Sequence, residues 1–183
     1  MRKMDLSIRD LCLIGIFTAI IAVISQLSIP MPYGVPMTMQ TFAIALAGMV
    51  LGTKKGTLSA LVYVLLGALG APVFSGFSGG MGVVLGMAGG FVLSFPLLAL
   101  AVGIGESKNK TRWLAAGLVA GIAVNYACGM LWFSFVMSSD WKTAFTACVL
   151  PFIPTDAIKA ALVMVLGRRM KGALVKGGVL LQH

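Results

Sequence analysis

Asp156 and Lys159 place opposite charges inside the apolar stretch CVLPFIPTDAIKAALVMVLGRR, residues 148–169. A charged side chain at the centre of a membrane-spanning helix costs about 2.5–3.5 kcal/mol on insertion scales, so it usually faces a partner or a cavity. Residues three positions apart share one helix face, and these two side chains can therefore pair. The spacing indicates a substrate site or an ion pair that only fixes helix packing, and we favour the substrate site.

The helix that carries this pair is expected to begin at a proline break. Pro151 and Pro154 precede Asp156, and the fixed φ of proline suits the first helical turn. Asp156 then lies near a helix N-terminus, where a carboxylate is favoured. Arg168 follows twelve residues later, roughly 18 Å along a helix, which places Asp156 in the outer part of a membrane. An interrupted apolar segment with ionisable residues is typical of a transporter substrate site.

The composition predicts a single membrane domain. Hydrophobic residues make up 59% of the 183 positions and charged residues 10%, and the mean hydropathy is +1.01. A water-soluble domain carries more charge than this. We expect an all-α, polytopic membrane protein with six transmembrane helices and one domain over residues 1–183. The expected spans are 8–28, 38–51 and 56–70, a fourth ending near 104, then 113–137 and the broken segment from 148.

The basic residues predict the orientation of the chain. A net charge of +9 could indicate nucleic-acid binding, but these residues are confined to particular loops. With six spans, twelve of the fourteen fall on one membrane face: Arg2, Lys3, Arg9, Lys54, Lys55, Lys108, Lys110, Arg112, Arg168, Arg169, Lys171 and Lys176. The positive-inside rule then places both termini in the cytoplasm, and we expect a lipid bilayer rather than nucleic acid as the partner. The first apolar run is long for a signal peptide and lacks a clear cleavage site, so it is expected to be a true span.

The sequence offers no recognisable catalytic set. The single histidine, His183, is terminal, and the cysteines have neither CxxC pairing nor ligand spacing. No Lys-Ser/Thr follows the glycine-rich region, which excludes a Walker A phosphate loop. We therefore expect no enzymatic activity, no catalytic residue, no metal and no cofactor.

A glycine-rich region, residues 67–90, holds nine glycines in twenty-four positions. It predicts close helix packing, a backbone that approaches a ligand, or a mixture of the two. Within it, VFSGFSGG at 73–80 is typical of a loop over a site. Phe74 and Phe77 would form an apolar lid, and Ser75, Ser78 and Gly79 are candidate ligand contacts.

Polar residues in other spans are further candidates for the site. Gln40 begins the second span beside a proline-rich loop, where Thr38 could cap the helix. Asn125 and Tyr126 lie in the middle of the fifth span. A buried Asn must find hydrogen-bond partners, so Asn125 either bonds across helices or lines the cavity.

Small residues in the first span predict close helix contact. Gly15 and Ala19 form one small-xxx-small face, and Thr18 and Ala22 form another. The partner could be another helix of this chain or a different subunit.

Three motifs together resemble the BioY family, the biotin-specific substrate-binding (S) components of energy-coupling factor (ECF) transporters. They are VPMTMQTFAIALAGMVLG at 35–52, LVYVLLGALGAPVFSGFSGGMGVVLG at 61–86 and PFIPTDAIKAAL at 151–162. The resemblance covers nearly the whole chain. It implies that Asp156 and Lys159 take part in biotin binding, Asp156 as an acceptor for a ureido N–H and Lys159 as a donor to a biotin oxygen.

The resemblance also implies high-affinity biotin uptake across a prokaryotic plasma membrane. Because the chain has no ATP-binding motif, the energy would come from a module of one transmembrane coupling (T) subunit and two ATPase subunits. Gly15 and Ala19 occupy the place of an Ala-xxx-Ala coupling motif, so Gly15, Ala19 and Ala22 are the expected contacts to that T subunit. Residues 86–91 are GMAGGF where the family commonly has GPTGGY, which puts polar contacts there in doubt.

Four alternatives stay open at this point. The chain could move biotin alone as a solitary transporter or facilitator, or it could be an S component for another vitamin. An intramembrane enzyme is a third alternative, although Asp156 and Lys159 alone supply neither a nucleophile–base set nor a metal site. A purely structural membrane subunit is the fourth.

Overall fold

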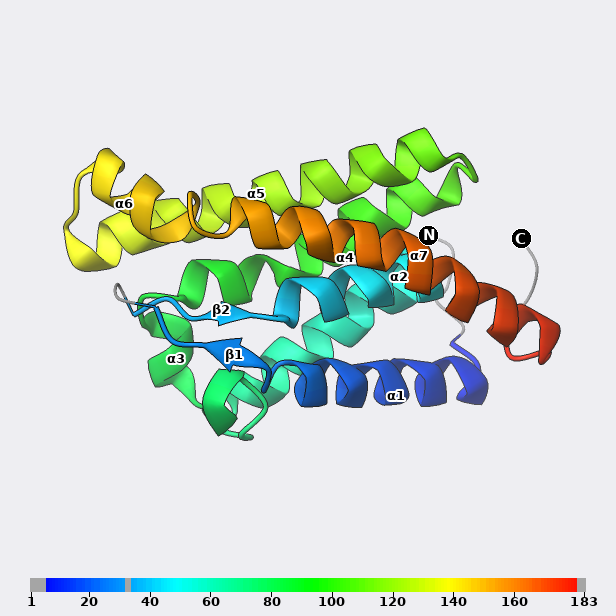
Figure 1. Cartoon of the computed structure of the whole chain (residues 1–183). Helices are drawn as coiled ribbons and strands as arrows, with labels where there is room; N and C mark the ends of the chain where they lie inside the picture. The colour runs from blue at the N-terminus through cyan, green and yellow to red at the C-terminus, as the bar shows by residue number, and fades with distance from the viewer. Residues whose placement is uncertain (1–5, 32–33, 181–183) are drawn as a thin grey trace, which may run out of the picture.

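A computed structural model describes residues 6–31 and 34–180 and shows a helical bundle (Figure 1). Arg2, Lys3 and His183 lie outside the described residues. The described part contains seven α-helices, one 3₁₀ turn (η1) and a two-stranded ribbon. The elements are α1 Ile8–Ile24, β1 Ser28–Ile29, β2 Met37–Thr38, α2 Gln40–Ala68, η1 Ser75–Phe77, α3 Met81–Leu85, α4 Gly89–Ser107, α5 Thr111–Met137, α6 Trp141–Cys148 and α7 Ile153–Lys176.

Helix α2 folds back on itself at Gly52. Gly52 has φ 77° and ψ −178°, a backbone conformation that is essentially restricted to glycine. The two halves of α2 then pack closely, because a Cβ on Gly56 would lie only 2.6 Å from Gly48 Cα. Helix α4 covers the turn, since a Cβ on Gly103 would meet the backbone of Thr53. The break expected between residues 51 and 56 is therefore present, at Gly52 inside α2.

The proline-rich loop after α1 contains the only regular β-structure of the described residues. Strands β1 and β2 pair antiparallel, with Ser28 opposite Thr38 and Ile29 opposite Met37. This short ribbon departs from the all-α expectation. It leads directly into α2, and Thr38 Oγ1 accepts a hydrogen bond from Gln40 N at 3.2 Å. The ribbon thus positions the first turn of α2.

The last apolar segment is broken as predicted. Helices α6 and α7 are bent by 44° across a short break. Pro154 occupies the first turn of α7, and Asp156 lies in that same turn. The ionisable pair is therefore held at the start of a helix, inside the bundle.

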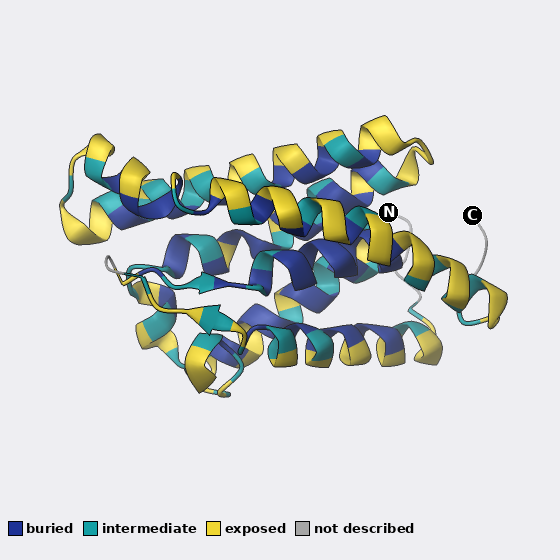
Figure 2. Cartoon of the chain, viewed as in Figure 1, coloured by how far each residue is buried: buried dark blue, intermediate teal, exposed yellow. Residues whose placement is uncertain are grey.

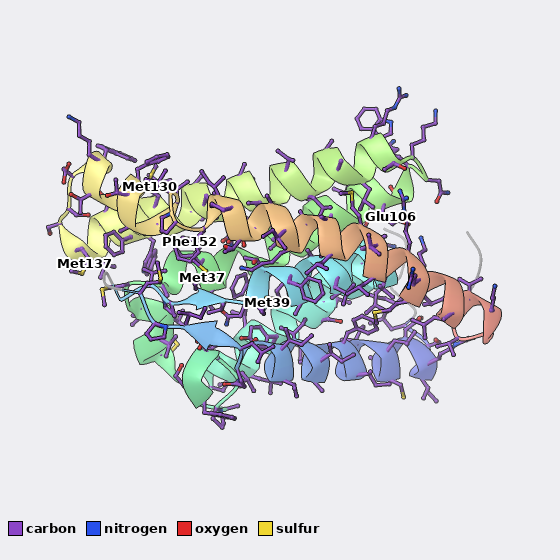
Figure 3. All side chains as sticks on the ribbon, viewed as in Figure 1. Met37, Met39, Glu106, Met130, Met137 and Phe152 are labelled. Carbon is purple, nitrogen blue, oxygen red and sulfur yellow. The ribbon has the colours of Figure 1, made fainter. Side chains whose placement is uncertain are left out.

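The predicted same-side loops meet at one end of the bundle. Lys55 Nζ lies 2.9 Å from Asp10 Oδ1, which joins the turn of α2 to the start of α1. Lys171 Nζ lies 2.8 Å from Glu106 Oε1, which joins α7 to the end of α4. Figure 3 shows Glu106 at this end and Met37 at the opposite one. The contacts support the predicted grouping of the charged loops.

The exterior of the bundle is apolar. Figure 2 shows exposed surface along the outward faces of α5 and α7, where Val119, Phe135 and Ile158 are 68%, 83% and 63% exposed. By length and composition, α2, α4 and α5 can cross a membrane, and the bent α6–α7 pair makes a fourth candidate. Such helices and such a surface suit lipid rather than water. The chain is a multi-pass membrane protein.

Candidate functional site

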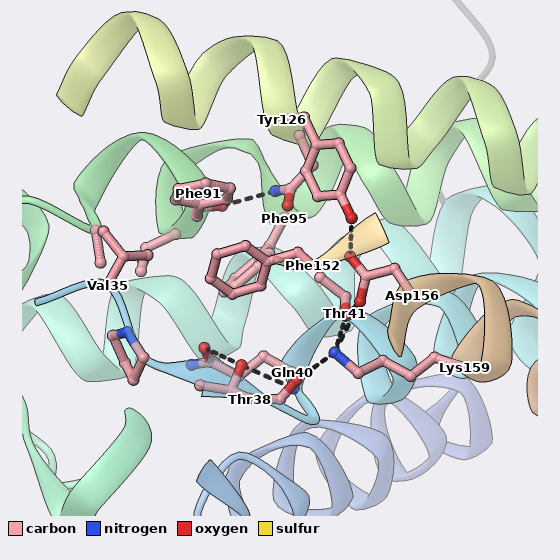
Figure 4. Close-up of a pocket in the computed structure, with 14 residues that line it drawn as sticks. Val35, Thr38, Gln40, Thr41, Phe91, Phe95, Tyr126, Phe152, Asp156 and Lys159 are labelled. Carbon is pink, nitrogen blue, oxygen red and sulfur yellow. Dashed lines mark hydrogen bonds and ion pairs between the residues drawn. The ribbon is translucent and has the colours of Figure 1, made fainter. Parts of the chain in front are cut away.

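Asp156 and Lys159 form a buried ion pair in the structure. Lys159 Nζ lies 2.7 Å from Asp156 Oδ1, and the side chains are only 8% and 4% exposed for Lys159 and Asp156, respectively. Thr41 donates to Asp156 Oδ1 at 3.1 Å, and Tyr126 donates to Oδ2 at 2.7 Å. Lys159 Nζ also donates to Thr38 O at 2.6 Å. Contacts from α2, α5 and the β2–α2 junction thus surround the pair (Figure 4).

The pair lines a small cavity whose other walls are mostly aromatic. The cavity has a volume of about 40 Å³. Its aromatic lining residues are Phe91, Phe95, Tyr126 and Phe152. The Phe91 and Phe152 rings lie 6.3 Å apart, and Figure 4 shows the Phe152 ring between Phe91 and Gln40. Polar groups at one side and aromatic rings at the other are what a compact, partly apolar ligand requires.

A larger cavity adjoins the small one. It has a volume of about 270 Å³ and is covered by the glycine-rich region. The two cavities share four lining residues: Pro36, Gln40, Ala88 and Val92. Together they approach the lower end of the range for small-molecule sites, about 300 Å³. A ligand longer than one ring system could occupy both.

Of the expected loop contacts, Phe74, Ser75 and Ser78 line the larger cavity. Phe74 is 1% exposed, and its ring packs edge-on against Tyr63 with centroids 5.5 Å apart, so it belongs to the core as well. Phe77 is 73% exposed and does not lie over either cavity. The expected pair of phenylalanines as a lid is therefore not formed. Gly79 packs on the loop backbone, because a Cβ there would collide with Ala71 O.

Gln40 lines both cavities and is held by a buried network. Its Nε2 donates to Tyr63 Oη at 2.7 Å, and Thr38 Oγ1 donates to its Oε1 at 3.0 Å. Tyr63 is 0% exposed, lies 2.8 Å from Ser25 Oγ and donates to Val73 O at 3.1 Å. The network ties α1, α2 and the loop above the larger cavity together. Tyr63 was not among the predicted residues, because its partners are distant in sequence.

Asn125 both bonds across helices and lines the small cavity. Its Nδ2 bonds across to α4, donating to Phe91 O at 3.0 Å and to Ser94 Oγ at 2.7 Å. The residue also lines the small cavity beside Tyr126. Helix α5 therefore contributes two adjacent polar side chains to the site.

The two small-residue faces of α1 have different surroundings. Thr18 donates to Ser59 O at 3.1 Å, and Ala22 packs on the hydrophobic core, so this face meets α2 of the same chain. Gly15 and Ala19 are exposed, and nothing lies within 4 Å of a Cβ built on Gly15. The Gly15–Ala19 face is thus open to another molecule, whereas Ala22 is engaged internally.

Phe91, Phe95, Phe152 and Thr41 also line the small cavity but were not among the predicted site residues. Phe152 and Thr41 both lie inside the quoted motifs. Phe152 is four residues before Asp156 in the sequence, and Thr41 bonds to Asp156 in the structure. Phe95 had no signal, because a phenylalanine in an apolar span is indistinguishable from a lipid-facing one.

The arrangement offers polar and apolar contacts to a small ligand. Within the described residues, no group of three or more His, Cys, Asp or Glu is arranged to hold a metal ion. The charged pair supplies a donor and an acceptor a few ångströms apart in a nearly dry site, where polar contacts are strong.

Comparisons with known proteins agree on one family. The profile of the BioY family matches residues 1–176. "Probable biotin transporter BioY" of Pyrococcus horikoshii is 40% identical over 164 residues, covering 90% of this chain and 97% of the relative. "Biotin transporter BioY" of Thermotoga maritima is also 40% identical over 164 residues, covering 89% and 96%.

A solved structure has the same fold. It is the crystal structure of "the S-component for biotin from an ECF-type ABC transporter", with a TM-score of 0.82 and 28% identity. The match covers 94% of this chain and 95% of that one. The similarity thus extends over nearly the whole bundle.

Proposed function

Because the chain belongs to the BioY family, we propose that it binds biotin and serves as the substrate-specific S component of an ECF-type transporter. The observation that carries this proposal is the Asp156–Lys159 pair, buried in the wall of a cavity rather than in helix packing alone. Biotin combines a polar ureido ring, an apolar thiophane ring and a valerate carboxylate. The polar and aromatic walls of the small cavity match the two fused rings.

We propose that the chain crosses the plasma membrane six times. The crossings are α1, the two halves of α2 on either side of Gly52, α4, α5 and α7. The end with the Lys55–Asp10 and Lys171–Glu106 pairs faces the cytoplasm, as the positive-inside rule requires. The β-ribbon, α3 and α6 then face the outside, and the substrate enters from there. Both chain ends lie in the cytoplasm in this arrangement.

Transport needs partners, since the sequence has no ATP-binding motif. A transmembrane coupling subunit and two ATPase subunits supply the energy. The exposed Gly15–Ala19 face of α1 is the contact for the coupling subunit, because it permits close helix approach. Release of biotin inside then follows a movement of the whole chain relative to that module.

The test separates binding from transport. Calorimetry on the purified chain in detergent should show tight biotin binding without any partner. Uptake of labelled biotin should then be measured in cells that lack their own uptake system, with the coupling module either active or carrying inactive ATPases. We expect uptake to collapse with inactive ATPases while binding persists. Unchanged uptake would favour a solitary transporter, and absence of binding by the folded chain would refute the assignment to biotin.

A further inference from the structure

Asn125 carries an unsatisfied acceptor in the wall of the small cavity. The residue is 0% exposed, and its Oδ1 has no hydrogen-bond partner among the described residues. A buried acceptor without a donor loses its hydration and gains nothing in return, so such atoms are rare in native proteins. Asn125 lines the cavity that also holds Asp156 and Lys159. A ligand in this cavity could satisfy the free oxygen.

Helix α4 fixes the orientation of the Asn125 amide. Its Nδ2 faces Phe91 O at 3.0 Å, and a backbone carbonyl can only accept. Ser94 Oγ donates its proton to the backbone of α4, with Gly90 O at 2.8 Å, and therefore accepts from the amide as well. If the Asn125 amide were flipped, its Oδ1 would face Phe91 O, and two acceptors would meet without a proton between them. The oxygen must therefore face away from these α4 groups.

The cavity-wall donors around Asp156 are already engaged. Tyr126 donates to Asp156 Oδ2 at 2.7 Å, and Thr41 donates to Asp156 Oδ1 at 3.1 Å. Lys159 Nζ donates to Asp156, Thr38 O and Thr41 Oγ1. A proton for Asn125 Oδ1 is best supplied by the ligand. In biotin, the ureido ring has two N–H groups, whereas the valerate is an acceptor at neutral pH.

We propose that Asn125 Oδ1 accepts a hydrogen bond from one ureido N–H of the ligand and thereby decides which end of the ligand enters the small cavity. This inference rests on the proposed function, since it assigns a cyclic urea to the site. Among the described residues, Asp156 Oδ2 accepts a bond only from Tyr126, so it has capacity for the second ureido N–H. Two acceptors on different helices then match two donors on one ring.

The orientation places the rest of the ligand in the larger cavity. The two cavities meet at Gln40 and Ala88, so the valerate chain extends from the ring toward Ser75 and Ser78. The ring takes the space that Phe152 now occupies at the centre of the small cavity (Figure 4). Phe152 lies in the short break between α6 and α7, where its ring can move without breaking either helix.

The test is a cycle of three ligands and two proteins. Biotin and its two ureido N-methyl analogues are titrated by calorimetry into wild type and Asn125→Ala. In wild type, methylation of the nitrogen that meets Asn125 should weaken binding by about five- to 150-fold, the range for a donor lost opposite a buried acceptor. In Asn125→Ala, biotin itself should bind more weakly, and the same methyl group should have a much smaller effect.

Ser94→Ala is the control for a purely structural effect. It removes one bond that holds the same amide but leaves the acceptor, so it should retain the preference for biotin over the methyl analogue. Thermal unfolding in detergent confirms that each variant is folded. Equal discrimination in wild type and Asn125→Ala would overturn the inference while leaving biotin binding intact. Failure of wild type to bind biotin would overturn the proposed function and the inference with it.

Discussion

The Asp156–Lys159 pair makes an asymmetric prediction about stability. Asp156 accepts from three donors, Lys159, Thr41 and Tyr126. Asp156→Ala leaves all three without their acceptor and leaves a lysine that is 8% exposed without a counter-ion. Breaking a buried pair in this way lowers the free energy of unfolding by about 3–5 kcal/mol. This variant should be strongly destabilised.

Lys159→Met should lower the free energy of unfolding by less than Asp156→Ala does. The methionine fills similar volume, and the Asp156 carboxylate keeps its bonds from Thr41 and Tyr126. Hydrogen bonds to a charged group are worth about 1.5–3 kcal/mol each, so these two bonds keep the carboxylate partly stabilised after the ion pair is lost. The double variant Asp156→Asn with Lys159→Met has no buried charge at this position. Its free energy of unfolding should lie within about 1 kcal/mol of wild type, because neutral replacements of buried pairs are often tolerated.

The assay combines unfolding and binding on the same samples. Unfolding in mixed micelles, followed by tryptophan fluorescence, gives the free energies, and calorimetry with biotin gives the affinities. We expect the double variant to recover stability but not binding. Equal costs for the two single variants, or a double variant at least as unstable as Asp156→Ala, would refute the reasoning about the shared hydrogen bonds. A double variant that binds biotin like wild type would show that the pair does not contact the ligand.

Two further predictions concern positions outside the cavity. Gly15→Leu should leave biotin binding unchanged but reduce coupled uptake severalfold. The added side chain blocks close helix approach on a face that is open in the isolated chain. The control is Ala120→Leu, on the exposed side of α5, which should not affect uptake. Gly52→Ala should lower the free energy of unfolding by about 1–3 kcal/mol through backbone strain at φ 77°, since nothing lies within 4 Å of its Cβ. Gly172 lies inside α7, and a Cβ built on it also meets no described atom within 4 Å. Gly172→Ala should therefore raise the free energy of unfolding by about 0.5–1 kcal/mol, since glycine destabilises a helix interior. Unfolding in mixed micelles, followed by tryptophan fluorescence, measures Gly52→Ala and Gly172→Ala.

The backbone preferences of proline and glycine predicted where the helices break. Proline restricts its own φ, so the break before Asp156 and the place of Pro154 in the first turn of α7 followed from the sequence. Glycine permits a sharp reversal, so a turn between residues 51 and 56 was expected. The pairing of β1 with β2 was not predicted, because four residues of strand carry almost no pattern. The same limit applies to the path of the glycine-rich region.

The candidate site was predicted only where a residue is unusual for its surroundings. Charge in an apolar span is costly, so Asp156 and Lys159 stood out. Of their partners, Tyr126 was predicted as a site residue, whereas Thr38 O was not, since it is 121 positions from Lys159 and belongs to the backbone. Phe74 and Phe77 had equal claims as loop aromatics, yet one is 1% exposed and the other 73%. Only the folded loop, with Phe77 at φ 54°, distinguishes them.

In the proposed function, the closed state of the charged pair determines how biotin gains affinity at this site. Asp156 and Lys159 already bond to each other and to Thr41, Tyr126 and Thr38 O, so a ligand that meets them exchanges existing bonds for new ones. Such exchange contributes little net free energy. The gain must come from groups that the empty site leaves unsatisfied and from apolar surface removed from water. Asn125 Oδ1 supplies the first, and the aromatic rings around the small cavity supply the second. The charged pair then acts chiefly by penalising ligands whose polar groups do not match it, which is specificity rather than affinity.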